Sequence, residues 1–178
     1  VMSILKVARL GHPVLRKTAD KVDIDKIPSD EIQRLIDDMI ETMREYDGVG
    51  LAAPQVHQSL QISVIESKKN PRYQGAPDIP LTILINPEFT FMSEETVEDW
   101  ESCLSVEDLR GKVSRSAKVT VSALDRAGEI MTLEASGFIA VVLQHEIDHL
   151  NGIVFLDRIK DMKSLSHMKE FEKFCSKE

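Results

Sequence analysis

Two histidines four residues apart are the strongest chemical signal in the sequence. His145 and His149 lie in QHEIDHLNG, residues 144–152, with Glu146 between them. Positions four apart share one face of an α-helix, about 5–6 Å apart at Cβ, so both imidazoles can bind one metal ion. In metal hydrolases such a glutamate takes a proton from metal-bound water, whose pKa the ion lowers from roughly 15.7 to about 7. The pattern predicts a hydrolytic metal site with Glu146 as its general base.

The helix expected to carry these residues is apolar almost all round. It covers SGFIAVVLQHEIDHL, residues 136–150, with Ser136 as the expected N-cap and Asn151-Gly152 as the stop. Such a helix belongs in a protein core. Two histidines and two acids, Glu146 and Asp148, would be costly to bury there unless they are paired or bind a metal. The segment therefore favours a metal site over a chance pattern, with a purely structural metal as the alternative.

A catalytic metal site needs a third protein ligand and an open position. The HExxHxxGxxH pattern of metzincin proteases is excluded, because the sequence reaches Gly152 and then has Phe155. A later glutamate, as in gluzincins, could be Glu170 or Glu172, although both lie in a mixed-charge run typical of a solvated face. The other candidate is Cys103 in WESCLSV, a lone cysteine in a loop-like acidic segment, whose thiolate would be a strong ligand. The residues alone leave these alternatives open.

The rest of the chain predicts one long amphipathic helix and several strands. Apolar residues in PSDEIQRLIDDMIETMREYDG, 28–48, follow the 3.6-residue period, with Ser29 as N-cap and Gly48 at the end. Strands are predicted at 61–67, 81–89, 118–125 and 131–135; apolar and polar residues alternate in 118–125, and the short loop DRAG joins the last two. The stretch 67–80 holds three prolines and a glycine and is expected to be a surface loop.

A third helix is expected at the end of the chain, from about 161 to 178. The order of elements predicts an α+β fold, in which antiparallel β-sheets pack around the central buried helix that carries HEIDH. The amphipathic helix lies before this core and the tail helix after it. With 178 residues, the chain 1–178 is expected to form a single catalytic domain.

Composition excludes several classes of protein. The net charge of -8 disfavours DNA binding, although residues 158–178 carry a local charge of +2 that could favour an anionic partner. No apolar run approaches the ~20 residues that a membrane span needs. Cys103 and Cys175 are too few for a disulfide framework, and no secretory signal is visible. We therefore expect a reducing compartment, the cytoplasm or an organellar or viral-host equivalent.

Three segments together resemble the motifs of peptide deformylases. They are GVGLAAPQ (48–55), ESCLS (101–105) and HEIDH (145–149), in that order and at compatible spacing. GHPVLR (11–16) and INP (85–87) also resemble that family, so the match spans about residues 5–160. Peptide deformylases remove the formyl group from the initiator methionine of new proteins. The resemblance implies the same activity here, by attack of metal-bound hydroxide on the formamide.

The resemblance also assigns the metal ligands and the catalytic groups. It implies that Cys103, His145 and His149 hold one divalent metal per chain. That metal would be Fe²⁺ in the native enzyme, and Zn²⁺, Ni²⁺ or Co²⁺ could also occupy the site. Glu146 would act as general base and later as acid. The side-chain amide of Gln55 and the backbone N–H of Leu104 would stabilise the negative oxygen of the tetrahedral intermediate.

Other positions are assigned to substrate binding and support. Gly48, Val49 and Gly50 would let the substrate backbone pair like an added strand, since glycine allows close approach. Phe138, Val141 and Val142 precede His145 by seven, four and three residues, hence share its helix face, and by family comparison line an apolar pocket for methionine. Glu101 and Arg110 match family positions near the cysteine and are expected to pair and brace its loop.

The sequence departs from the family pattern at two positions. Ser102 stands where the family usually has glycine, so a positive φ there would strain the backbone. Glu107 stands where the family usually has proline. Both positions lie next to the metal ligand and the substrate groove, and we count Ser102 among the substrate-binding positions. These departures bear on rate and specificity more than on metal binding.

The leading hypothesis is a metal-dependent hydrolase acting on N-formylmethionyl nascent polypeptides. One alternative is a zincin-like metalloendopeptidase that cuts internal peptide bonds. Another is a catalytically weakened relative that binds formyl-Met termini. The expected partners are nascent peptides and, transiently, the ribosome through the slightly basic C-terminal helix. DNA and membranes are not expected partners.

Overall fold

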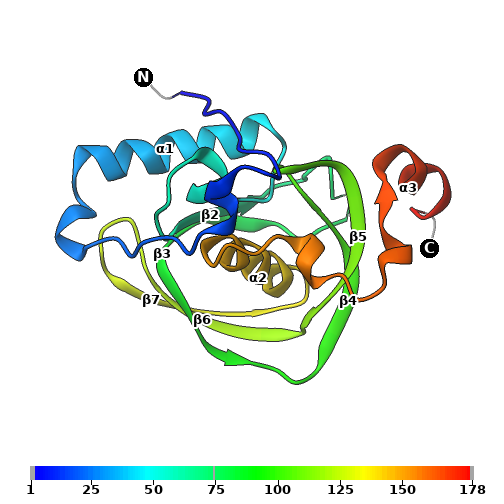
Figure 1. Ribbon diagram of the computed structural model, residues 1–178. Helices are drawn as coiled ribbons and strands as arrows, with labels where there is room; N and C mark the ends of the chain where they lie inside the picture. Colours follow the sequence, from blue (N-terminus) through cyan, green and yellow to red (C-terminus); the bar gives the residue numbers. More distant parts are fainter. Residues whose placement is uncertain (1–2, 74, 177–178) are drawn as a thin grey trace.

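The fold is built around one buried helix. The computed structural model describes residues 3–73 and 75–176 and places α2, Phe138–Leu150, between two antiparallel sheets (Figure 1). The five-stranded sheet has the order β1 (Gly50–Ala52), β2 (Ile62–Ser67), β3 (Ile79–Met92), β6 (Lys118–Leu124), β7 (Ile130–Ser136). The second sheet has the order β4 (Thr96–Cys103), β5 (Val106–Ser116), β8 (Ser166–His167). The expected α+β architecture is confirmed.

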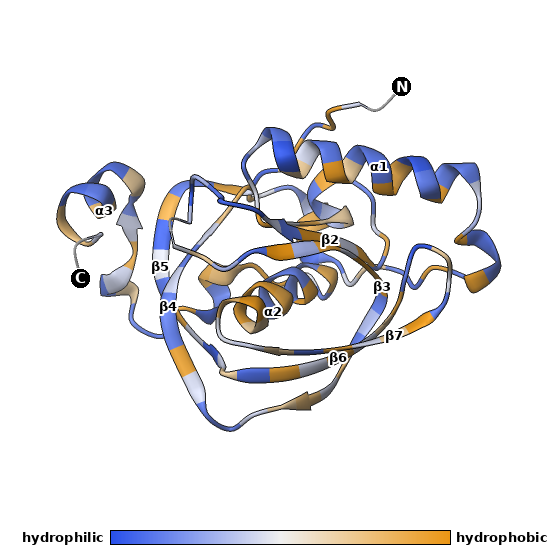
Figure 2. Cartoon of the chain, turned by 180° about the vertical axis from the view of Figure 1, so that it is seen from behind, coloured by the Kyte–Doolittle hydropathy of each residue, from blue (hydrophilic) through white to orange (hydrophobic). Residues whose placement is uncertain are grey.

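The first helix, α1, covers Asp30–Glu45 and packs against β1 and β2. Its N-cap is Ser29, as predicted, since Ser29 Oγ accepts the N–H of Ile32 at 3.4 Å. The apolar positions of its 3.6-residue period are the buried ones. Figure 2 shows the amphipathic α1 on the outside of β2 and the largely hydrophobic α2 enclosed by the strands. Hydrophobic burial along α1 therefore fixes β1, which carries the glycine motif, next to α2.

The central helix begins one residue later than expected. Ser136 was predicted as its N-cap, but Ser136 ends β7, and the N-cap is Gly137 with φ 60° and no side-chain cap. The chain turns directly from strand to helix there, and a positive φ suits glycine. At the other end the predicted stop is confirmed. Gly152 has φ 72°, and an added Cβ would lie 2.7 Å from the carbonyl carbon of Arg16.

The segment around Cys103 is a strand rather than a loop. Thr96–Cys103 forms β4, which pairs with β5 as a long antiparallel hairpin. The prediction missed it because β4 is largely exposed over Thr96–Asp99 and buries Glu101, Ser102 and Cys103 consecutively at its end, so apolar alternation is absent. The tight turn after Cys103 sets the position of the sulfur from the sheet. Cys103 is thus held by a paired strand.

The C-terminal helix is shorter than predicted. A helix over 161–178 was expected, but α3 covers only Met168–Phe174. Before it, Met162–Ser164 forms a 3-10 turn and Ser166–His167 forms β8 on the edge of β5. The unpaired backbone groups at that edge bond the chain and hold it extended. Residues 177–178 of the predicted helix lie outside the described residues.

The remaining helical segments are short 3-10 turns. They are η1 (Pro13–Arg16), η2 (Ile24–Lys26), η3 (Ala53–Val56) and η4 (Phe155–Arg158). The predicted β6–β7 hairpin across DRAG is confirmed, with Asp125 Oδ1 accepting the N–H groups of Ala127 and Glu129. No helix among the described residues combines the length and apolar character that a membrane crossing would require.

Candidate active site

Two elements bring three metal-binding side chains together. Cys103 comes from the end of β4, and His145 and His149 come from α2. One ligand atom from each lies within 4.8 Å of the others, and Cys103 Sγ is 3.3 Å from His149 Nε2. Cys103 and His149 are almost fully buried. The alternative third ligands, Glu170 and Glu172, are exposed on α3 and do not join this group. The geometry thus selects Cys103.

His145 is oriented by a carboxylate on its far side. Its Nδ1 lies 2.8 Å from Glu101 Oε2. Glu101 is an acceptor, because its pKa is about 2. Burial acts to raise that pKa, but hydrogen bonds from Arg115 and His145 and their charges outweigh it. Nδ1 is therefore the donor, and Nε2 is left as the metal-binding atom, an arrangement common behind metal-binding histidines.

Arg115 pairs with Glu101, and Arg110 does not. Arg115 donates to both Glu101 oxygens, from Nε at 2.7 Å and from Nη2 at 2.9 Å. The predicted pairing of Glu101 with Arg110 is wrong. Glu101 lies opposite Gly111 in the hairpin, so the odd-numbered side chains of β5 share its face. Arg110 therefore lies on the other face of the strand.

The same arginine also ties down α2. Arg115 Nη1 donates to Asp148 Oδ2 at 2.5 Å. Arg158, in η4, donates to both oxygens of Asp148, at 3.1 and 2.7 Å. Asp148, one of the two acids between the histidines, is thus paired, as the burial of its charge requires. Neither Arg115 nor Arg158 is among the predicted site residues. If β5 were recognised as a strand from the sequence, Arg115 would be expected on its buried face, because it alternates with the other buried positions of that strand.

The residues present fit a divalent metal ion. Burial acts to raise the pKa of the Cys103 thiol, but the charges and hydrogen bonds of His149 and His145 outweigh it and hold that pKa well below its ordinary value. A thiolate and two imidazoles are the donor set that zinc or ferrous iron accepts. Among the described residues, His149 Nδ1 and Glu146 Oε2 are buried without a hydrogen-bond partner. Such unsatisfied polar atoms are uncommon unless a ligand, water or ion completes the site.

Gln55 points its amide nitrogen at this group. Its Oε1 accepts the backbone N–H of Ala52 at 2.9 Å, which fixes the orientation of the amide. Its Nε2 then donates toward Cys103 Sγ at 3.4 Å and to Ser105 Oγ at 3.2 Å. Gln55 is 2 % exposed, and its amide nitrogen lies beside the three converging side chains.

Gly50 and Glu146 occupy neighbouring space at atomic contact. A Cβ added at Gly50 would lie 2.3 Å from Glu146 Oε1. Any side chain there would displace the carboxylate, which explains the glycine in physical terms. Burial is the largest influence on Glu146 and raises the pKa of its carboxyl group. A buried acid with a raised pKa is suited to carry a proton.

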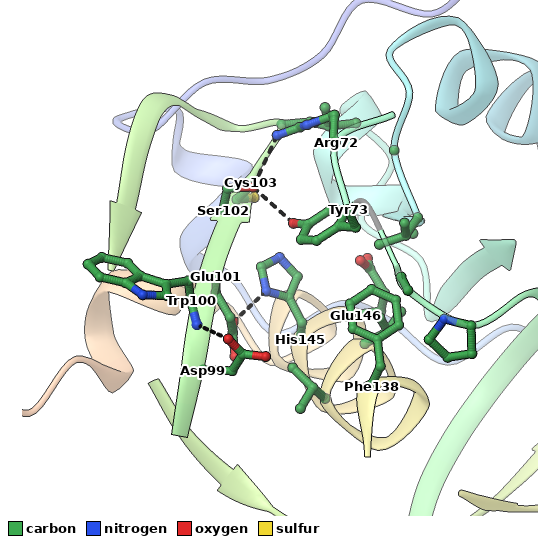
Figure 3. Close-up of a pocket in the computed structure, with 18 of the residues that line it drawn as sticks. Arg72, Tyr73, Asp99, Trp100, Glu101, Ser102, Cys103, Phe138, His145 and Glu146 are labelled. Atoms are coloured by element: carbon green, nitrogen blue, oxygen red, sulfur yellow. Dashed lines mark hydrogen bonds and ion pairs between the residues drawn. The ribbon is translucent and has the colours of Figure 1, made fainter. Parts of the chain in front are cut away.

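Cys103, Gln55, His145 and Glu146 line a cavity of ≈ 380 Å³. Figure 3 shows His145 and Glu146 facing the same space as Phe138, with Cys103 and Ser102 on the β4 side. The expected pocket residues all line this cavity. They are Gly48, Val49, Gly50, Ser102, Phe138, Val141 and Val142, and Leu104, expected as a backbone hydrogen-bond donor, lines the cavity as well. The volume and the mixture of apolar walls with converging polar groups are typical of a small-molecule or side-chain site.

Comparisons with known proteins agree with this geometry. The model of the family Polypeptide deformylase matches residues 4–165. The chain belongs to the peptide deformylase family. A peptide deformylase of Nostoc sp. is 40 % identical over 174 residues, covering 98 % of this chain and 96 % of that protein. A Met-Ala-Ser-bound class I type b peptide deformylase from Acinetobacter baumannii is 41 % identical, with a TM-score of 0.87 over 89 % of this chain and all of that one. The peptide deformylase of Thermotoga maritima superposes with a TM-score of 0.76 at 37 % identity, over 89 % of this chain and 99 % of that one.

Deformylases are metal-dependent, and this chain presents a Cys/His/His group able to hold the metal. The identity of that metal is a separate question. The structure also shows the surroundings of Ser102 and Glu107, the two positions at which the chain departs from the family pattern.

Ser102 is not strained. Its φ is not among the positive values of the chain, so the strain expected for a residue in place of glycine is absent. Its Oγ instead accepts from Arg72 Nη2 at 3.1 Å and lies 2.9 Å from Tyr73 Oη. Both partners come from the loop between β2 and β3. Sequence analysis missed their part in the cavity, because no local pattern places a loop residue across from a strand. Glu107, the other departure, pairs on the surface with Arg9.

Proposed function

We propose that this chain removes the formyl group from N-formylmethionine at the start of nascent polypeptides. The observation that carries the proposal is the convergence of Cys103, His145 and His149 beside Gln55 and Glu146 at the end of a cavity. Membership of the deformylase family supports it. So does the Met-Ala-Ser bound to the Acinetobacter relative, whose residues correspond to a deformylated product. A purely structural metal would not need the adjoining cavity.

One divalent ion per chain would be held by Cys103 Sγ and one nitrogen each of His145 and His149. When bound, such an ion polarises a carbonyl oxygen and lowers the pKa of water. We propose Fe²⁺ as the native ion, with Zn²⁺, Ni²⁺ or Co²⁺ able to replace it. The mixed sulfur and nitrogen donors support this choice of borderline metals. Metal analysis of protein purified without oxygen tests it.

Glu146 would handle the proton in the reaction. Its carboxylate lines the cavity and occupies the space that is free because Gly50 on β1 has no side chain. In the proposed reaction it takes a proton from the attacking water and passes it to the departing amine nitrogen. The buried surroundings that raise its pKa support the second transfer.

Two hydrogen-bond donors would stabilise the negative charge on the formyl oxygen. One is Gln55 Nε2, already fixed by the contact of Oε1 with Ala52. The other is the backbone N–H of Leu104 in the turn after β4. Donors held in place before the reaction stabilise such charge without the cost of reorganisation. Glu101 supports the metal site by orienting His145, and Arg110 supports the loop between β2 and β3.

The substrate would bind as an extra strand beside Gly48, Val49 and Gly50. Its methionine side chain would enter the apolar end of the cavity, against Phe138, Val141 and Val142. Ser102 and Leu104 also line this cavity. This direction places the formyl carbon at the polar end, near Glu146.

Formate release tests the proposal. Protein loaded with Fe²⁺ under anaerobic conditions should release formate from formyl-Met-Ala-Ser. It should leave acetyl-Met-Ala-Ser intact, and it should not cut either peptide internally. Binding without formate release would favour a catalytically weakened relative, and internal cleavage would favour an endopeptidase. Either result contradicts the proposal.

We also propose that the enzyme acts in the cytoplasm, on chains emerging from the ribosome. The C-terminal helix α3 lies at the outside of the molecule, beyond β5 (Figure 1), and carries Lys169 and Lys173. These lysines could contact ribosomal RNA. Co-sedimentation with ribosomes should weaken when both are changed to glutamate. Unchanged co-sedimentation, or none in the unmodified protein, would contradict this contact.

A further inference from the structure

We propose that Arg72 selects substrates that carry a carboxylate side chain one or two residues after the formylmethionine. This inference rests on the proposed function and adds a preference for substrate sequence. It arises from a guanidinium held at the wall of the cavity without an acidic partner.

Arg72 is fixed in position from several directions. Its Nη2 donates to Ser102 Oγ at 3.1 Å, beside the metal ligand Cys103 (Figure 3). Its carbonyl oxygen accepts from Arg110 Nη2 at 3.2 Å. The next residue, Tyr73, packs on Phe138 with ring centroids 5.5 Å apart. The guanidinium is thus held beside the place where a substrate strand would pass.

Arg110 strengthens the hold on this loop. It is 9 % exposed, and its guanidinium lies 5.4 Å from the centroid of the Tyr73 ring and 4.7 Å from that of Phe171 on α3. Cation–π contacts of this kind stabilise a buried arginine. The packing runs from α3 through Arg110 to the loop. Arg72 is therefore presented by a braced segment.

The positive charge at this wall is not neutralised. Within residues 3–73 and 75–176, neither Arg72 nor Arg110 forms an ion pair with a carboxylate. Asp99 also lines the cavity, but it bonds the N–H of Trp100 and lies beyond Glu101, away from Arg72 (Figure 3). Glu172 and Asp99 act on Arg110 only through charge at longer range, so the Arg72 guanidinium is the one that a bound anion would stabilise.

The position of Arg72 suits a contact with the substrate residues that follow the formylmethionine. Arg72 lines the cavity of ≈ 380 Å³ and also a second cavity of ≈ 390 Å³, and the two share Ser102, Cys103 and Leu104. With methionine at the apolar end of the first cavity, the chain leaves past Leu104 toward the second. Lys6 also lines the second cavity, whereas Glu107 there is paired with Arg9 and Asp108 is the remaining acid.

The net charge of the chain opposes the proposed preference for acidic peptides. The chain has a net charge of -8, so long-range electrostatics alone would disfavour an acidic peptide. A preference for a carboxylate must then come from local cations. A charge contact that is the same in the bound substrate and in the transition state predicts an effect on KM with little change in kcat.

Matched peptides isolate the charge. The pairs are formyl-Met-Asp-Ser-amide against formyl-Met-Asn-Ser-amide, and formyl-Met-Ala-Asp-amide against formyl-Met-Ala-Asn-amide. Asp and Asn have nearly the same shape, and the amide removes the terminal carboxylate. For at least one pair, kcat/KM should favour Asp by about fivefold at low salt, the size expected for a partly exposed ion pair. High salt should reduce this ratio.

Three variants assign the preference to Arg72. Arg72→Met should bring the Asp/Asn ratio close to one, and Arg72→Lys should keep part of it. Lys21→Gln, which removes a cation outside both cavities, should leave the ratio unchanged.

Two results overturn the inference while the proposed function stands. The first is an Asp/Asn ratio near one in the unmodified enzyme. The second is an Arg72→Met variant that slows all peptides equally and keeps the ratio, since Arg72 would then only position the loop. Absence of formate release from every peptide would instead overturn the proposed function itself.

Discussion

At the scale of single residues, the site depends on one contact between a glycine and a carboxylate. Gly50 on β1 leaves the space that Glu146 occupies, and Glu146 Oε2 has no hydrogen-bond partner among the described residues. The adjoining cavity is the place from which a partner would come. Glu146 therefore lines the cavity without being one of the three metal-binding residues, so its role can be tested separately from theirs.

Glu146→Gln tests that separation. The amide has the same size but cannot take a proton, so kcat should fall by about 10²–10⁴-fold, the usual size of a general acid–base contribution. Metal content should stay the same, because Glu146 is not among the three converging ligands. Formate assays and metal analysis on one sample provide the measurement. Glu134→Gln, the same change at an exposed position of β7, is the control. An active Glu146→Gln enzyme would refute the assignment.

The residue scale also shows what could be predicted. His145, His149 and Glu146 follow from helical spacing, and Cys103 and Gln55 follow from motifs. The partner of Glu101 depends instead on which side of β5 each arginine faces. Without recognising β4 and β5 as paired strands, the sequence offered no way to prefer Arg115 over Arg110.

At the scale of elements, Arg115 joins β4, β5 and α2 through Glu101 and Asp148. Because Arg115 is buried and pairs with two carboxylates, its loss should lower the free energy of unfolding more than the loss of a surface arginine would. Arg115→Met would leave two buried carboxylates without their shared cation, and removing one partner from a buried charge network costs about 3–5 kcal/mol.

Chemical denaturation of the metal-free protein measures that cost. Metal is removed because bound ligand adds stability of its own. Arg126→Met is the matched control, since Arg126 pairs with Asp37 on the surface and should contribute less than about 1 kcal/mol. Equal losses in the two variants would show that the buried network is not a stabilising connection between the sheet and the helix.

A second tie joins α1 to β2 and predicts a dependence on pH. Arg44 donates from Nε and Nη2 to the two oxygens of Glu66, at 2.7 and 3.0 Å, and holds the pKa of Glu66 below its ordinary value. A lowered pKa in the folded state means that the contribution is present above the ordinary value of 4.5 and is lost as pH falls through the folded value.

Glu66→Gln should therefore cost about 0.5–1 kcal/mol at pH 7, a size reduced by the exposure of Arg44. The cost should shrink as pH falls from the ordinary value of 4.5 through the lowered pKa of the folded state, where Glu66 becomes protonated. Denaturation curves of both proteins between these pH values measure the difference. A cost that stays constant across this range would show that it comes from something other than the ion pair.

The elements themselves were predictable to different degrees. Helix α1 and strands β6 and β7 show clear periodicity, because each has one face in the core. Helix α2 and strand β2 are instead recognised as apolar runs, because they are buried on nearly all sides. The hairpin of β4 and β5 does not, since its polar outer face and buried charges hide the alternation. The short β8 and α3 depend on the edge of β5, which is a tertiary contact and leaves no local signal.

At the scale of the whole molecule, the sheets close around α2, and the cavity opens where β1, β4 and the loop between β2 and β3 meet the helix. Sequence patterns locate the chemistry on α2 and β4. They do not locate Arg72 and Tyr73, because their place at the cavity depends on Ser102, Arg110 and α3. Substrate preference is therefore the property least visible in the sequence.

The central claim is that one thiolate from β4 and two imidazoles from α2 hold a single metal ion and leave a position open for water and substrate. X-ray absorption spectroscopy of the metal-loaded protein tests this most directly. We expect a first shell with one sulfur, two imidazole nitrogens and one further light atom, and Cys103→Ser should lose the sulfur and most of the metal. A shell without sulfur, or one made of four protein ligands, would contradict the account.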